Sequence, residues 1–135
     1  MAAQTDLCSL VGDIAELGSA KRLVDVGSGF SAPAAQWRSS HGSLDISCVN
    51  INFQQLLSAM KAEEKMSLLN ATSTALPLSD ESADRIVALE SAQHFRLLEK
   101  FISKSRKVLK PNGLLIIVMP VVTQAKPFFK LGILA

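Results

Sequence analysis

Residues 24–33, VDVGSGFSAP, hold the first residue types whose spacing suggests chemistry. Gly27 and Gly29 follow a short apolar run, and Asp25 stands two residues before the first glycine. A strand that enters a helix through such a turn can change direction tightly and bring backbone N–H groups close to a ligand. The stretch therefore indicates a nucleotide-binding turn, although glycine turns after strands also occur without any ligand.

Two residues help to separate the nucleotides that this turn could hold. Residues 27–32 fit the dinucleotide pattern G-x-G-x-x-A. Asp25 would repel the pyrophosphate of a dinucleotide but would attract a ligand with a cationic amino-acid end. Asn50 ends a later apolar run, where an NAD site prefers a carboxylate for the ribose hydroxyls. An NAD-dependent oxidoreductase is therefore the weaker alternative.

Two further side chains, Glu90 and His94, are candidates for catalysis. Their i, i+4 spacing would put them on one helical face if the segment coils. His94 is a candidate general base for an acceptor whose proton must leave. The alternative is a histidine that packs at a helix start beside Phe95. Glu90 is a candidate contact of cofactor or acceptor, against a structural or solvated role.

Composition and spacing exclude several other classes of site. The two cysteines and two histidines are scattered without ligand spacing, so no metal is expected. The nucleophile elbow G-x-S-x-G and the Walker pattern are absent from the sequence. A net charge of +2 is too small to favour nucleic acid or an anionic membrane. The most apolar run, GLLIIVMPVV, is about half as long as a membrane span, and no signal peptide is evident. Two cysteines without a disulfide framework indicate free thiols in a reducing cytosol, so we expect a cytoplasmic protein.

The elements that must position these residues alternate along the chain. Apolar runs predict strands at 22–27, 43–51, 66–71, 84–91 and 114–120, helix formers predict helices at 32–40, 53–65 and 96–109, and KPNG at 110–113 predicts a turn. Such alternation predicts an α/β sandwich of three layers, with a mostly parallel sheet and ligands at the carboxyl ends of its strands. The 135 residues, 48% of them hydrophobic, suit one domain over 1–135, with a core at about 20–120 and a tail at 121–135.

Four motifs in order resemble the class I S-adenosylmethionine-dependent methyltransferases. They are the D-x-G-x-G turn, CVNINFQQLLSA, ALPLSDESADRIVALESAQHF and FISKSRKVLKPNGLLIIVMP. The segment ESAQH is similar to the branch that methylates small molecules such as sterols and tocopherols. The resemblance implies a Rossmann-like sheet of order 3-2-1-4-5, S-adenosyl-L-methionine as cofactor and a small-molecule acceptor.

The resemblance also implies roles for individual residues. Asp25 would hold the amino-acid end of the cofactor, directly or through water, and Gly27, Ser28 and Gly29 would let the backbone approach its methionyl and ribose portions. The later strands would contribute the rest: Asn50 at the ribose hydroxyls, Ile51 near the adenine, Thr72 and Ser73 at the adenine edge, and Leu89 and Glu90 facing the methyl donor and acceptor.

The sequence departs from the family at four positions. Ser31 replaces a frequent third glycine, Asn50 the usual acid, Thr72 the usual aspartate and Asn112 the first glycine of P-G-G. Asn50 can still bond a hydroxyl, more weakly than a carboxylate by about 1 kcal/mol. Affinity for the cofactor is therefore expected to be reduced rather than lost.

The family fold continues past the fifth strand with a helix and an antiparallel strand pair. This sequence ends in VVTQAKPFFKLGILA, so we expect a chain truncated after the fifth strand, without that pair. An uncovered strand edge would favour self-association or a partner. We predict a methyltransferase; a degenerate, non-catalytic relative or a partner-dependent subunit is the alternative.

Overall fold

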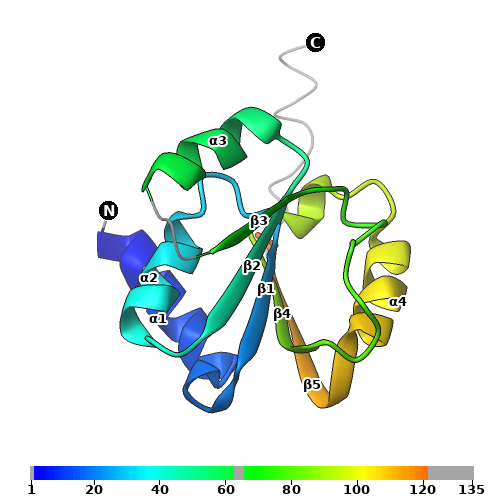
Figure 1. Ribbon diagram of the computed structural model, residues 1–135, viewed down its shortest axis with the longest axis horizontal. Helices are drawn as coiled ribbons and strands as arrows, with labels where there is room; N and C mark the ends of the chain where they lie inside the picture. Colours follow the sequence, from blue (N-terminus) through cyan, green and yellow to red (C-terminus); the bar gives the residue numbers. More distant parts are fainter. Residues whose placement is uncertain (1, 63–65, 122–135) are drawn as a thin grey trace, which may run out of the picture.

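A sheet of five parallel strands lies at the centre of the part of the chain that the structure describes (Figure 1). The computed structural model describes residues 2–62 and 66–121. The strand order β3-β2-β1-β4-β5 confirms the predicted order, with the reversal beside β1. The strands are β1 (Arg22–Val26), β2 (Asp45–Asn50), β3 (Ser67–Asn70), β4 (Ala83–Leu89) and β5 (Leu109–Val118).

Helices cover both faces of this sheet, which gives the predicted three-layer sandwich. In Figure 1, α1 and α2 lie on one side of the sheet and α4 on the other, while α3 lies beside β3. The α-helices are α1 (Ala2–Ile14), α2 (Ala32–Ser40), α3 (Phe53–Ala62) and α4 (Leu98–Val108), and two short 3-10 turns are η1 (Leu17–Ser19) and η2 (Ala92–His94). Helix α1 was not predicted from the sequence.

The two faces of the sheet build two separate hydrophobic cores. Successive side chains of a strand point to opposite faces, and in β1 Leu23 packs with α1 and α2 whereas Val24 and Val26 pack on the side of α4. Trp37 of α2 is buried in the first core, and its indole Nε1 donates to the Cys8 carbonyl of α1 at 2.7 Å. This bond fixes α1 against α2, above the carboxyl end of β1.

The segment KPNG lies within β5 rather than in a turn before it. Ala83 pairs with Leu109 and Arg85 with Leu114, so residues 110–113 lie opposite the single residue Asp84. They form a bulge, in which Asn112 adopts a φ of 64°. The prediction of a turn at 110–113 followed by a strand is therefore wrong in its boundary, because the chain continues to pair with β4 on both sides of the bulge.

Other boundaries differ from the predictions as well. Helix α4 begins at Leu98 rather than at 96, and residues 63–65 of the predicted helix 53–65 lie outside the described residues. The tail predicted at 121–135 is described only at Val121, so the expected uncovered edge and partner remain predictions.

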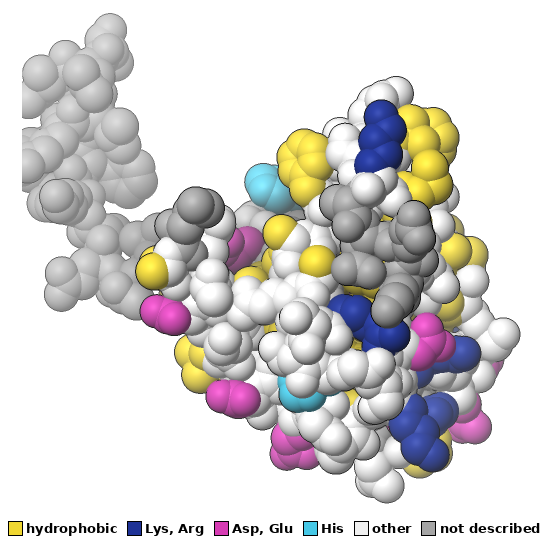
Figure 2. Space-filling view, turned by 60° about the vertical axis from the view of Figure 1, so that its left-hand side comes forward, with side chains coloured by type: hydrophobic (Ala, Val, Ile, Leu, Met, Phe, Trp, Pro, Cys, Tyr) yellow, Lys and Arg dark blue, Asp and Glu magenta, His cyan; other side chains and the backbone are white. Residues whose placement is uncertain are grey.

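The surface on the α1–α2 side mixes acidic, basic and hydrophobic side chains (Figure 2). Such interspersed charge is typical of a solvated surface. Among the described helices, none is both long enough and apolar enough to cross a membrane.

Candidate cofactor site

The glycine turn after β1 is held against the end of β2 by backbone hydrogen bonds. The N–H groups of Gly27 and Ser28 both donate to the Val49 carbonyl, at 2.7 and 3.1 Å, and Ser31 N–H donates to the Ser28 carbonyl at 2.7 Å. By contrast, the N–H groups of Gly29 and Phe30 have no partner among the described residues. The outer half of the turn therefore presents two free donors.

Three residues of the turn adopt left-handed backbone conformations. The φ angles are 75° at Gly27, 54° at Gly29 and 62° at Ser31. Ser31 thus adopts the positive φ that a glycine would adopt most easily, at a cost of about 1–2 kcal/mol. The departure from a third glycine has changed the residue but has kept the shape of the turn.

Asp25 lies beneath this turn on the face that α1 and α2 cover. It is 2% exposed, and its Oδ2 has no hydrogen-bond partner among the described residues. Burial raises the pKa of Asp25 to about 7. An unpaired buried carboxylate is costly, and such groups concentrate at functional sites.

Two buried thiols share this layer with Asp25. Burial, together with the negative charge of Asp25, raises the pKa of Cys48 to about 12. The pKa of Cys8 is raised as well, by burial and then by the charges of Asp25 and Glu90. The negative potential that both thiols experience suits a ligand that brings a positive charge to the turn.

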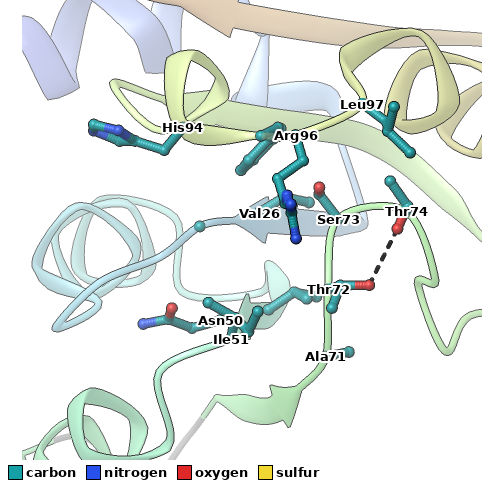
Figure 3. A pocket seen from close by; sticks show the side chains of 13 residues that line it. Val26, Asn50, Ile51, Ala71, Thr72, Ser73, Thr74, His94, Arg96 and Leu97 are labelled. Carbon is teal, nitrogen blue, oxygen red and sulfur yellow. Dashed lines mark hydrogen bonds between the residues drawn. The ribbon is translucent and has the colours of Figure 1, made fainter.

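A cavity of about 530 Å³ opens at the carboxyl ends of β1 and β2 (Figure 3). Its walls are largely apolar, with a few hydroxyl and amide groups, as is usual for sites that hold small organic ligands. The predicted site residues that line it are Gly27, Asn50, Ile51, Thr72, Ser73 and His94.

Leu89 and Glu90 line a second hollow, on the side of α1 and α2. It measures about 390 Å³, and Cys8 and Phe30 also line it. Because Gly27 lines the first cavity and Phe30 the second, the glycine turn lies between the two. The predicted site residues that line a hollow are thus divided between two hollows on either side of one turn, whereas Asp25, Ser28 and Gly29 line neither of these two.

Glu90 and His94 do not share a helical face, because the segment between them does not form an α-helix. Glu90 has a φ of 53°, and its N–H donates to the Val118 carbonyl of β5 at 2.7 Å, so it still belongs to the sheet edge. Only the three-residue turn η2 follows. A left-handed residue at the end of β4 prevents the segment from continuing as a helix.

Several residues that line the first cavity were not predicted from the sequence, above all Arg96. In Figure 3 its side chain points toward Val26 and Ser73, whereas the His94 imidazole points away from them. Arg96 forms no ion pair or hydrogen bond with any described residue. The other unpredicted lining residues are Val26, Val49, Ala71, Thr74, Phe95 and Leu97.

The methyltransferase domain family matches residues 24–117, from within β1 to within β5. The chain belongs to this family. It is a class I S-adenosylmethionine-dependent methyltransferase domain, as its motifs and its sheet order indicate.

Relatives of this methyltransferase domain carry names of different kinds. Sterol methyltransferase-like 1 of Botryococcus braunii is 29% identical over 109 residues, which are 76% of this chain and 28% of that protein. Erythromycin 3''-O-methyltransferase of Saccharopolyspora erythraea is 26% identical over 121 residues, 85% of this chain and 40% of that protein. The chain thus spans well under half the length of the curated relatives it matches.

Solved structures share the fold of the methyltransferase domain. The [4+2]-cyclase SpnF superposes with a TM-score of 0.78 at 24% identity, over 83% of this chain and 43% of SpnF. The YcgJ protein of Bacillus subtilis superposes with a TM-score of 0.74 at 24% identity, over 83% of this chain and 49% of that protein. At these identities the likeness shows the fold alone.

The residues around the glycine turn fit the cofactor of the family. S-adenosylmethionine carries a carboxylate and an ammonium group at one end and an adenosine at the other. The free N–H groups of Gly29 and Phe30 suit the carboxylate, and the unpaired Oδ2 of Asp25 suits the ammonium group. The largely apolar first cavity suits the adenosine.

Proposed function

We propose that this domain binds S-adenosylmethionine across the glycine turn and transfers its methyl group to a small-molecule acceptor. The observation that carries the proposal is the buried carboxylate of Asp25, whose Oδ2 has no partner among the described residues. It lies directly beneath a turn with two free N–H donors. The carboxylate of Asp25 matches the ammonium group of an amino-acid end, and the free N–H donors of the turn match its carboxylate.

The predicted roles of the remaining site residues follow from this placement. Adenosine would occupy the first cavity, with Ile51, Thr72 and Ser73 around the base. The Oδ1 of Asn50 accepts one hydrogen bond, from Asn52 N–H at 3.1 Å, and keeps a second lone pair for a ribose hydroxyl. The methyl group would point toward the second hollow, past the end of β4.

Methyl transfer depends mainly on how the methyl donor and the acceptor are positioned. The bound cofactor supplies an electrophilic methyl group on a sulfonium, and an in-line displacement gains much of its rate from orientation of the two reactants. Glu90, exposed at the second hollow, is placed to take the proton that a hydroxyl or amine acceptor loses. His94 lines the first cavity with its imidazole pointing away from Val26 and Ser73, so it is not placed to share a proton with Glu90.

We propose an apolar acceptor for this methyl group. Most of the second hollow is lined by apolar side chains, with Gln4, Thr5, Gln36 and the carboxylate of Glu90 among them. Relatives named for a sterol and for erythromycin support acceptors with large apolar bodies. Cys8 and Cys48 are free thiols, which suits a reducing compartment such as the cytoplasm.

A second candidate function is cofactor binding without methyl transfer. Asn50 and Thr72 stand where the family has acids, and SpnF, which shares the fold, is named for a different reaction. A domain of this kind would bind the cofactor or its product and show no turnover with any acceptor.

Calorimetric titration tests the proposal. We expect S-adenosylhomocysteine to bind with a Kd in the micromolar range and NAD to give no heat. Asp25→Asn should weaken S-adenosylhomocysteine at least about tenfold because the ammonium group loses its counter-charge. Asp45→Asn, at the opposite end of the sheet beside Arg22, is the matched control and should bind as the wild type does. Binding of NAD alone would overturn the proposal.

A further inference from the structure

Asn50 uses both N–H bonds of its side-chain amide at the end of β2. It is 6% exposed, and its Nδ2 donates to the Gly29 carbonyl at 3.0 Å and to Gln55 Oε1 at 2.8 Å. One of these partners belongs to the glycine turn and the other to the first turn of α3. The side chain therefore connects the turn, the end of β2 and α3.

Only a side chain with a donor can make the contact with Gly29. A carboxylate at position 50 would set its oxygens against the Gly29 carbonyl, acceptor against acceptor. Gln55 could rotate its own amide to offer a donor, but a carbonyl cannot. The asparagine that replaces the usual acid thus makes a hydrogen bond that the acid could not make.

This hydrogen bond fixes the orientation of one peptide group. The Gly29 carbonyl and the Phe30 N–H belong to the same planar trans peptide, so the two bonds point in opposite directions. With the carbonyl held toward Asn50, the Phe30 N–H points away from β2. It has no partner among the described residues.

We infer that Asn50 is a positioning residue, which orients the Gly29–Phe30 peptide so that the Phe30 N–H can bind the carboxylate of the cofactor's amino-acid end. The inference rests on the proposed function for its ligand, but the hydrogen bond to Gly29 exists without any ligand. Asn50 would then have two roles. Its Oδ1 would contact the ribose, and its Nδ2 would orient the Gly29–Phe30 peptide.

Two ligands that differ in the amino-acid end separate these roles. S-adenosylhomocysteine has that end, whereas 5′-methylthioadenosine has the same adenosine and lacks it. Asn50→Asp should weaken S-adenosylhomocysteine about tenfold relative to 5′-methylthioadenosine, the equivalent of one hydrogen bond to a charged group, because any gain from a carboxylate at the ribose is common to both ligands. The ratio of the two Kd values is the readout, measured by calorimetry on the whole chain.

Asn70→Asp is the matched control for this variant. Asn70 also donates its amide to backbone carbonyls at the same edge of the sheet, to Asn50 at 2.9 Å and Ile51 at 3.0 Å, but makes no bond to the glycine turn. We expect this variant to change both Kd values by one common factor. If Asn50→Asp also changed the Kd values of both ligands by one common factor, or changed neither Kd, the positioning role would be refuted.

Hydrogen exchange of the ligand-free chain tests the contact with Gly29 independently of the proposed function. The N–H of Ser28, bonded to the Val49 carbonyl, should exchange about tenfold faster in Asn50→Asp and at the wild-type rate in Asn70→Asp. Unchanged exchange would overturn the inference.

A wild type that bound neither ligand would overturn the proposed function instead. If Asn50→Asp failed to fold, Asn50→Ala removes the same donor without adding a charge and should give the same ratio.

Discussion

Ser91 occupies the space that a side chain on Gly27 would need. A Cβ built on Gly27 would lie 2.4 Å from the Cβ of Ser91 and 2.7 Å from its Oγ. Ser91 cannot retreat freely, because its Oγ donates to the Val26 carbonyl at 2.8 Å. The first glycine of the turn is therefore required by packing between β1 and the segment after β4, and the second is required only by its backbone conformation.

Gly27→Ala should consequently destabilise the fold far more than Gly29→Ala. We expect a loss of about 3 kcal/mol in the free energy of unfolding at Gly27, from the positive φ together with the contact with Ser91. At Gly29 a Cβ would meet nothing within 4 Å, so the loss should be about 1 kcal/mol. Urea unfolding of both variants measures the difference, and equal losses would contradict it.

Asp25→Asn should stabilise the ligand-free domain above neutral pH. The pKa of Asp25 rises from 3.8 to about 7 on folding, so between these values the folded state binds more protons than the unfolded state. The stability of the wild type must then fall as the pH rises from 4 to 7 and level off above 7. Removing the charge should recover a few kcal/mol at pH 8, since one pKa unit corresponds to about 1.4 kcal/mol.

Thermal unfolding at several pH values checks this expectation. The asparagine variant should show a flatter pH profile than the wild type, and Asp45→Asn should leave the profile unchanged because Asp45 is exposed. A gain in stability combined with weaker binding of S-adenosylhomocysteine is the signature of a residue retained for its ligand. A loss of stability at pH 8 would show that Asp25 has a partner that the fold requires.

Asp84→Asn should destabilise the amino end of the sheet. The Oδ2 of Asp84 accepts the N–H groups of Lys21 at 3.1 Å and Arg22 at 2.8 Å. Burial raises the pKa of Asp84, but these two bonds and the charge of Lys110 outweigh it and hold the pKa below the usual value. The stabilisation is therefore present above pH 4 and is lost as the pH falls through the lowered pKa.

We expect this variant to lose about 1–2 kcal/mol at pH 7. Its deficit relative to the wild type should shrink toward pH 3, which unfolding curves at the two pH values would reveal. Binding of S-adenosylhomocysteine should not change, because Asp84 lies at the end of the sheet opposite the glycine turn. A change in affinity without a change in stability would exclude this structural role.

Ile51→Ala should lower the affinity for S-adenosylhomocysteine without lowering the stability of the fold. Ile51 is 71% exposed yet lines the first cavity, where the adenine is proposed to bind. Losing this contact should reduce the affinity about fivefold, in proportion to the apolar surface that the ligand would have covered. Leu10→Ala is the control, since Leu10 of α1 is 54% exposed and does not line that cavity. Equal affinities of the two variants would place the adenine elsewhere.

The order of the sheet could be predicted because its signals are local and strong. Apolar runs such as 22–26 alternate with helix formers, and parallel strands joined in this way allow few arrangements. Helix α1 gave no comparable signal, because only Cys8, Val11 and Gly12 of its thirteen residues are buried. What holds it are contacts between distant segments, such as the hydrogen bonds from Trp37 to the Cys8 carbonyl and from Gln36 to the Thr5 carbonyl.

The candidate site was predictable to the extent that it lies at strand ends. Carboxyl ends of parallel strands meet at one edge, so Gly27, Asn50 and Thr72 could be grouped from their places in the chain. The left-handed conformation of Glu90 could not be foreseen, since it depends on pairing with Val118 of β5. Arg96 was missed because its position resembled an ordinary helix start.

The two hydrogen bonds that Gly27 and Ser28 give to the Val49 carbonyl form in the chain without a ligand. The conformational entropy of Gly27 and Ser28 is therefore lost when the chain folds and not when a ligand binds. Association should then proceed without a slow rearrangement of the turn. The heat-capacity change on binding should reflect only the apolar surface that the ligand covers.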